Sequence, residues 1–293
     1  MKERDSLYRF LFEHHPVRGE LVHLDASWRA VLDRQDYPPE VAAVLGEAMA
    51  ATVLLGSTLK FEGALTLQLQ GDGPLHLLVV QCTSERNLRG MAQWHGDVAG
   101  LELSALVGAG RLAITIEQSG RAERYQGIVP LEGDSLAQSF EAYFRRSEQL
   151  PTRLWLTAGG SAAAGLMLQT LPGETDDSGD PDAWNRFTML ADTVTPGELR
   201  DLAAQDLLHR LYHEEDVRLF ESAPVAFRCR CSRERIADML RSLGHDEVRS
   251  IVADEGEVRV ACEFCGREYR FDSVDTQALF ADGSGLPGSS TRH

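Results

Sequence analysis

Four of the five cysteines in this 293-residue chain fall into two close pairs. Cys229 and Cys231 form a Cys-x-Cys pair, Cys262 and Cys265 form a Cys-x-x-Cys pair, and 30 residues separate the two pairs. A Cys-x-x-Cys turn directs two thiolates at one ion, and Gly266 directly after it allows the tight backbone that this turn needs. The spacing therefore predicts one tetrahedral Zn²⁺ held by four thiolates. Such a site is closed, which argues against a catalytic zinc.

The same sulfurs are candidates for redox chemistry, because zinc-bound thiolates remain nucleophiles toward oxidants. If each cysteine joined its near neighbour, zinc would leave and nothing would connect the two pairs. If the cysteines joined across the pairs, a covalent link would replace the zinc and keep the unit closed. Residues two apart on a strand lie about 6.6 Å apart, so a Cys229–Cys231 disulfide would need a bent backbone. The residues alone leave both pairings open.

A thiol oxidoreductase is a weaker interpretation of the Cys-x-x-Cys pair. In that class the motif opens a helix, whose N-terminus lowers the pKa of one thiol. Here the motif follows a predicted strand and precedes another, REYRF. The fifth cysteine, Cys82, lies in an apolar predicted strand and is interpreted as a core residue.

The elements around the four cysteines predict a small C-terminal unit at residues 225–280. Apolar residues at helical spacing, ended by Gly244, predict a helix, and these residues are Ile236, Met239, Leu240 and Leu243. A hairpin turn is expected at 254–257, leading into a strand in which Val258, Val260 and Cys262 share one face. A unit of about 55 residues has a marginal core, which a bound metal commonly supplements. The Gly- and Ser-rich residues 281–293 are predicted to be disordered.

The N-terminal part, residues 1–175, has the pattern of a sheet-rich domain with a few helices. YPPE at 37–40 opens one predicted helix and 135–150 forms another. Alternating or continuous apolar runs predict six strands, at 64–70, 75–82, 110–118, 124–131, 153–158 and 165–172. We therefore expect an α+β fold with a helical acidic linker and a small C-terminal four-cysteine zinc domain.

The predicted linker, residues 176–224, is unusually acidic. Residues 171–228 contain 13 Asp and Glu against five Arg and no Lys, which is half of the net charge of −16. Thr195 and Glu198 form a capping box that begins a helix, whose apolar stripe comprises Leu199, Leu202, Ala203, Leu208, Leu211 and Tyr212. Two interpretations stay open: a solvated helix docked on the first domain, or a metastable element.

Composition excludes several classes of function. A net charge of −16 opposes binding of nucleic acid across the whole surface, because such binding depends on Lys and Arg. The charged N-terminus has no signal peptide pattern, and no apolar run reaches the roughly 20 residues needed to span a bilayer. We therefore expect a cytoplasmic protein without membrane contact, in a compartment where thiols stay reduced.

The chain resembles the redox-regulated heat-shock protein 33 chaperones of bacteria, also called 33 kDa chaperonins. The resemblance is carried by FRCRCSRERI and ACEFCGREYRF with their spacing, and by four further segments that follow the family's order: GDGPLHLLVV (71–80), LRG (88–90), YFRRSEQLPT (143–152) and GLMLQTLPG (165–173). It implies an ATP-independent holdase that binds unfolding client proteins through residues 1–175. It implies that the reduced, zinc-bound form is inactive.

The resemblance also implies how the protein is switched on. Hypochlorous acid, or peroxide with unfolding stress, would form the disulfides Cys229–Cys231 and Cys262–Cys265 and release zinc. The zinc unit and the linker would then unfold, uncovering a hydrophobic surface on the first domain, and the oxidised chain would tend to form a homodimer.

The alternative is a zinc-ribbon nucleic-acid-binding protein. Six arginines near the cysteines make it conceivable, at 228, 230, 233, 235, 241 and 249. The acidic surroundings argue against it. No catalytic triad, phosphate loop or paired-carboxylate site stands out, so we expect no enzyme.

Overall fold

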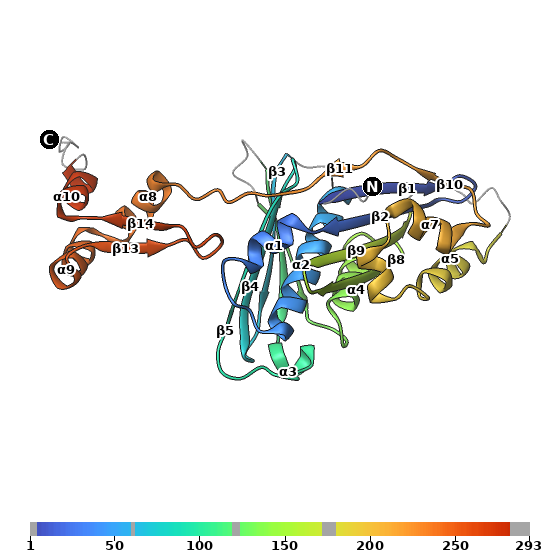
Figure 1. Cartoon of the computed structure of the whole chain (residues 1–293), viewed down its shortest axis with the longest axis horizontal. Helices are drawn as coiled ribbons and strands as arrows, with labels where there is room; N and C mark the ends of the chain where they lie inside the picture. The colour runs from blue at the N-terminus through green and yellow to red at the C-terminus, as the bar shows by residue number, and fades with distance from the viewer. Residues whose placement is uncertain (1–4, 60–61, 119–123, 172–179, 282–293) are drawn as a thin grey trace, which may run out of the picture. The chain divides into compact units, whose positions relative to one another are not determined.

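A computed structural model describes residues 5–59, 62–118, 124–171 and 180–281 of the chain (Figure 1). The chain divides into two compact units, an N-terminal unit (Met1–Arg228) and a cysteine unit (Cys229–His293). The described part of the predicted linker, from residue 180 onward, packs within the N-terminal unit. Residues 176–179 of that linker lie outside the described residues.

The first sheet of the N-terminal unit, sheet A, is antiparallel and has the order β10-β1-β2-β9-β8, with β11 also paired to β1. Its strands are β1 (Ser6–Phe12), β2 (Val17–Leu24), β8 (Thr152–Gly159), β9 (Ala162–Thr170), β10 (Val217–Leu219) and β11 (Ala223–Pro224). Both faces of this sheet are buried, since its residues divide between two hydrophobic cores.

The second sheet, sheet B, has the order β12-β5-β4-β3-β6-β7 and is antiparallel except for the short parallel pair of β12 with β5. Its strands are β3 (Gly63–Gln70), β4 (Leu75–Thr83), β5 (Asn87–Trp94), β6 (Arg111–Gln118), β7 (Arg124–Pro130) and β12 (Ala226–Phe227). The predicted hairpin at 64–82 is confirmed as β3 and β4.

The long helix α2 (Pro39–Thr58) contacts strands of both sheets and forms the centre of the first core. It lies so close to sheet A that a Cβ on Gly46 would come within 2.4 Å of the Ala158 Cβ. Among the described residues α2 alone has the length and apolar composition to cross a membrane, but 67% of its apolar window is buried inside the protein. It is therefore a core helix. Three further helices complete this part, α1 (Ala26–Leu32), α3 (Leu103–Val107) and α4 (Leu136–Ser147).

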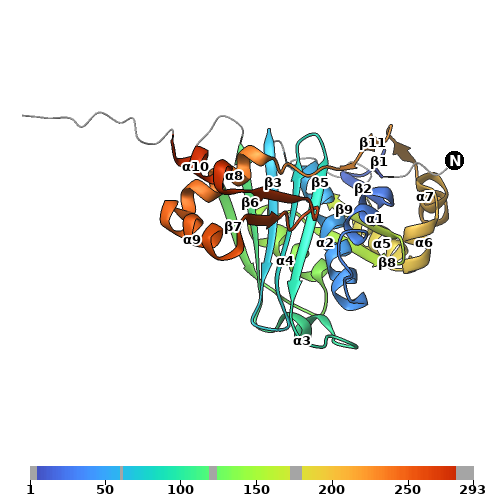
Figure 2. The same cartoon turned by 60° about the vertical axis from the view of Figure 1, so that its left-hand side comes forward.

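The acidic linker forms three helices, α5 (Ala183–Ala191), α6 (Pro196–Asp201) and α7 (Ala204–Tyr212), which gather beside β8 and β9 in both views (Figures 1 and 2). The predicted capping box is confirmed: the Glu198 N–H donates to Thr195 Oγ1 at 3.2 Å, and the Thr195 N–H donates to Glu198 Oε2 at 2.9 Å. The prediction of one continuous helix to Tyr212 is wrong. Leu202 has an extended backbone (φ −74°, ψ 147°), which ends α6 and turns the chain before α7 begins.

The cysteine unit has three helices around a two-stranded hairpin, and these are α8 (Arg233–Leu243), α9 (His245–Glu255), β13 (Val258–Ala261), β14 (Glu268–Phe271) and α10 (Ser273–Ala281). The hairpin turn predicted at 254–257 is wrong. Helix α9 continues to Glu255, and Gly256 ends it with a left-handed φ of 84°. The hairpin turns instead at residues 262–267. Of the predicted disordered tail, Ala281 ends α10 and the rest lies outside the described residues. The α+β prediction is confirmed.

Candidate metal centre

The structure brings the four predicted ligands together. The Sγ atoms of Cys229, Cys231, Cys262 and Cys265 all lie within 4.8 Å of one another. The shortest separations are 3.4 Å between Cys231 and Cys265 and 3.6 Å between Cys229 and Cys262. Zn–S bonds of about 2.3 Å in a tetrahedron place sulfurs about 3.8 Å apart. Four sulfurs at this spacing fit a metal ion of that kind.

The turn between β13 and β14 positions Cys262 and Cys265. The Cys262 N–H donates to the Arg267 carbonyl at 2.9 Å, while the Cys265 and Gly266 N–H groups donate to the Cys262 carbonyl at 3.2 and 2.7 Å. Gly266 has a φ of 65°, which is the conformation that the sequence pattern assigned to it. This turn holds both thiols on the same side of the hairpin end.

The other pair lies directly before α8. Ser232 caps that helix by accepting a hydrogen bond from the Arg235 N–H at 3.3 Å, which fixes the backbone next to Cys231. The Tyr269 hydroxyl, on β14, donates to the Cys231 Sγ at 3.1 Å. This tyrosine is a contact of the site that sequence reasoning missed.

The four thiols do not share one electrostatic environment. Burial raises the pKa of Cys229, but hydrogen bonds from the Cys231 backbone and from neighbouring thiols outweigh burial and lower this pKa to about 7. Burial, with hydrogen bonds to other thiols, raises the pKa of Cys265 to about 12, and burial also raises that of Cys262. Four thiolates in so small a space repel one another, and a divalent cation would offset that repulsion.

The four cysteines are half-buried, so a small oxidant or chelator can reach them. Cys82 contrasts with them, as the sequence predicts. It is buried in the first core, and desolvation raises the pKa of its thiol to about 12, which keeps it protonated and unreactive.

Three of the six arginines named for the nucleic-acid alternative have partners within the cysteine unit. Arg233 pairs with Asp275 at 2.7 Å, and Arg241 pairs with Asp238 at 2.6 Å. The Arg235 guanidinium donates to the Arg230 carbonyl at 3.0 Å. These interactions do not favour the zinc-ribbon nucleic-acid alternative.

A second feature of the N-terminal unit bears on function: the acidic linker covers an apolar face of sheet A. The second hydrophobic core is shared between the sheet and the linker. The sheet contributes Phe10, Phe12, Leu21, Leu166 and Leu168. The linker contributes Phe187, Leu199, Leu207, Leu208, Leu211 and Tyr212. The Phe187 ring stacks on the Phe12 ring with centroids 3.8 Å apart. Removing the linker would therefore expose a continuous apolar surface.

Polar contacts also hold the linker on sheet A. Asp192 accepts hydrogen bonds from the Trp155 indole and the Arg153 guanidinium, both at 2.9 Å. Arg200 donates to the Thr157 hydroxyl at 2.6 Å, and His23 Nε2 lies 2.9 Å from the Leu199 carbonyl oxygen. Sequence reasoning missed these contacts. Alternation along β8, which places residues 153, 155 and 157 on one face, was the signal that pointed to them.

Comparisons with known proteins agree on one class, the chaperonins of 33 kDa. A family model described as Hsp33 protein matches residues 5–272. The 33 kDa chaperonin of Nitrosococcus oceani is 53% identical over 293 residues, covering 100% of both chains. That of Methylobacillus flagellatus is 49% identical over 294 residues, again covering 100% of both.

A solved structure supports the fold over the same length. The crystal structure of the 33 kDa chaperonin of Thermotoga maritima matches with a TM-score of 0.81 at 21% identity, covering 95% of this chain and 99% of that one. The chain belongs to the Hsp33 family. Its relatives are named chaperonins, a non-enzymatic class, so it is a chaperone-family protein and not an enzyme.

Proposed function

We propose that the chain is a redox-regulated, ATP-independent holdase that is inactive when reduced and zinc-bound. The observation that carries this proposal is the set of four half-buried sulfurs within 4.8 Å of one another. They lie in a unit whose buried core contains only six apolar side chains within the described residues, and these are Ala237, Leu240, Val248, Val258, Tyr269 and Phe271. So small a core depends on a bound metal to stay folded.

Zn²⁺ is the metal we propose, because four thiolates at tetrahedral spacing suit it and Hsp33 membership agrees with it. When bound, zinc would join the chain before α8 to the turn after β13. All four cysteines, Cys229, Cys231, Cys262 and Cys265, would be its ligands.

Oxidation is the proposed trigger. We propose disulfides Cys229–Cys231 and Cys262–Cys265, as the family resemblance implies. Each would close within its own pair, so neither would replace the link that zinc provides between the pairs. The shortest sulfur separations run across the pairs, so cross-pairing is the outcome that a disulfide map must exclude. Loss of zinc would unfold the unit at 225–280.

The linker at 176–224 is the proposed relay, and residues 1–175 the proposed client-binding domain. The linker's side chains cover the apolar face of sheet A, and its excess of acidic residues favours the solvated state once it is released. The exposed surface would bind unfolded or partly unfolded proteins. We place this activity in the bacterial cytoplasm, with the oxidised chain as a homodimer.

One experiment tests the proposal as a whole. Zinc release is followed with a chromogenic chelator during hypochlorous acid or peroxide treatment, while light scattering follows aggregation of a denatured client in the same samples. Suppression that rises together with zinc release is expected. Equal suppression before and after zinc release rules out a redox switch.

Two variants sharpen this test. Cys265→Ser should lose tight zinc binding, whereas Cys82→Ser should keep both zinc and the switch, because Cys82 is a buried core residue. Peptide mapping of the oxidised chain by mass spectrometry then decides the pairing. Disulfides running across the two cysteine pairs would contradict the proposed release.

A further inference from the structure

Residues 216–228, here called the strap, pair with one edge strand of each sheet in the N-terminal unit. The strap contains β10 and β11, which pair with β1 at the edge of sheet A, and β12, which pairs with β5 at the edge of sheet B. On their other sides β1 pairs with β2 and β5 pairs with β4. Within the described residues, one stretch of chain therefore pairs with an edge strand of each sheet, along much of β1 but only at Asn87 and Leu88 of β5.

Main-chain hydrogen bonds attach the strap along its length. In sheet A the Glu13 N–H donates to the Asp216 carbonyl at 2.9 Å. Four strap N–H groups donate to carbonyls of the N-terminal unit at 2.8 to 3.1 Å, and these pairs are Phe220 to Arg9, Val225 to Asp5, Ala226 to Arg86 and Arg228 to Leu88. Because these bonds use the backbone, they do not depend on the identity of the strap's side chains.

Few strap side chains reach the cores. Val225 is 4% exposed and joins the first core, while Phe227 is half-buried against it with the Arg34 guanidinium 5.0 Å from its ring. Val217 and Leu219 are half-buried against the second core. The strap thus shows what each edge accepts: an extended backbone with an apolar side chain at intervals.

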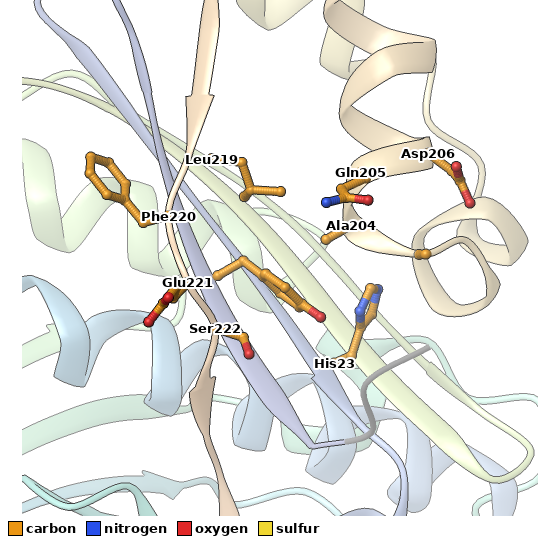
Figure 3. Close-up of a pocket in the computed structure, with 10 residues that line it drawn as sticks. His23, Ala204, Gln205, Asp206, Leu219, Phe220, Glu221 and Ser222 are labelled. Carbon is orange, nitrogen blue, oxygen red and sulfur yellow. The ribbon is translucent and has the colours of Figure 1, made fainter. Parts of the chain in front are cut away.

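The side chains in the middle of the strap, at residues 219–222, are half-buried or exposed. A pocket of about 800 Å³ lies beside it, with residues 219–222 on one side and the first turn of α7 on another (Figure 3). His23 of sheet A also lines this pocket (Figure 3). Tyr8 of the same sheet is a further lining residue. The Phe220 side chain is 41% exposed rather than packed. Between its two ends the strap is therefore held by strand pairing and main-chain hydrogen bonds more than by buried side chains.

We propose that unfolded client segments bind by adding as β-strands to the edges of β1 and β5 that the strap vacates. An exposed strand edge presents unpaired N–H and C=O groups, which pair with any extended chain. Such pairing suits a holdase, because unfolded proteins share a backbone and not a sequence. The strap is then an internal occupant that the client replaces.

This inference rests on the proposed function, since the strap must leave before a client can enter. The chain itself connects the two events: the last main-chain bond of the strap is made by Arg228, and Cys229 is the next residue. Unfolding of the cysteine unit would therefore free the strap from its C-terminal end.

A peptide with the strap's own sequence, residues 217–228, tests the proposal on the full-length chain. A labelled peptide is titrated into reduced and oxidised protein, and binding is followed by fluorescence anisotropy. Much tighter binding to the oxidised chain is expected, because the strap pairs with β1 and with the start of β5 in the reduced chain. At saturation the peptide should reduce the amount of bound client at least fivefold.

The matched control is the same peptide with N-methyl groups on the amides of residues 220 and 225. It keeps every side chain but loses two donors, so binding should weaken about tenfold. Equal competition by both peptides would show that side-chain packing, and not strand addition, holds the client. That result overturns the proposal, as does a client that stays fully bound at saturating peptide.

Two further outcomes are distinguishable. If the oxidised chain fails to suppress aggregation, the proposed function is wrong, and peptide binding measured without client still decides whether the edges open. If a second copy fills the edges, the peptide should dissociate a dimer and leave client binding unchanged, which also overturns the proposal. Hydrogen exchange adds a direct readout, since client binding should slow exchange of amides in β1 and β5.

Discussion

Truncation of Phe187 to alanine should release the linker without oxidation. Phe187 is fully buried on α5, stacks on Phe12 with ring centroids 3.8 Å apart, and lies edge-on to Tyr212 at 6.2 Å. A buried Phe→Ala substitution costs about 3–5 kcal/mol, as lost transfer free energy plus the cavity left behind. Because Phe187 is on the linker side of the second core, most of this cost lowers the free energy that holds the linker on sheet A.

A loss of this size raises the ratio of undocked to docked linker by roughly 10²- to 10⁴-fold. Local opening of this kind is measured by hydrogen exchange of amides in α5, α6 and α7, with the reduced, zinc-loaded protein. Faster exchange in these three helices is expected, with β3 and β4 unchanged. The reduced variant should also suppress client aggregation in part.

Met189→Ala is the matched control, because Met189 lies on the same helix and its side chain is 69% exposed. Surface substitutions of this kind usually change stability by less than about 0.5 kcal/mol. If both variants exchange at the same rate, Phe187 does not hold the linker in place. If Phe187→Ala speeds exchange in β3 and β4 equally, the linker does not open separately from the rest of the N-terminal unit. Either result refutes the reasoning.

Three further predictions concern the metal centre and a buried carboxyl group. Removal of zinc by a chelator, or the substitution Cys265→Ser, should unfold the cysteine unit and leave the N-terminal sheets intact. Calorimetry and circular dichroism can measure both effects. Unchanged melting of the cysteine unit would contradict this prediction. Tyr269→Phe removes the hydrogen bond to the Cys231 sulfur, so zinc release by peroxide should become a few-fold faster. A chromogenic chelator can follow this release. An unchanged rate would show that the Tyr269 hydroxyl does not protect the site. Burial raises the pKa of Glu20 from 4.5 to about 8. The folded state therefore holds a proton that the unfolded state loses, so stability should fall as pH rises from about 4.5 to about 8, and Glu20→Gln should flatten that slope in chemical denaturation.

Local patterns predicted the parts of the structure that depend on local geometry. The four candidate metal ligands follow from spacing, because a Cys-x-x-Cys turn is a property of a few consecutive residues. Helix α2 and the β3–β4 hairpin follow from the proline at the helix start and from alternation before a GDGP turn. These elements would look the same in many folds.

Sheet A was harder to predict, because its strands are covered on both faces. Along β2, Leu21 belongs to the second core and Val22 to the first, and the polar residues Glu20 and His23 are buried too, so polarity does not mark a solvent face. A strand buried on both sides loses the alternation that identifies strands in a sequence. The contact of His23 with the Leu199 carbonyl joins residues 176 positions apart, and no local pattern carries such a pairing.

The order of elements along the chain determines the order in which they would open in the proposed switch. While the cysteine unit is folded, the strap directly precedes a folded segment that begins at Cys229. Once that unit unfolds, the strap becomes the start of a long free tail, and chain segments next to free tails fray first. Fraying would begin at β12, which has two residues, continue through β11 and β10, and reach α7 and α5 only afterwards. The strand edges would therefore be exposed before the apolar face of sheet A. A client would first form main-chain hydrogen bonds with these edges and would bury apolar side chains against the sheet afterwards.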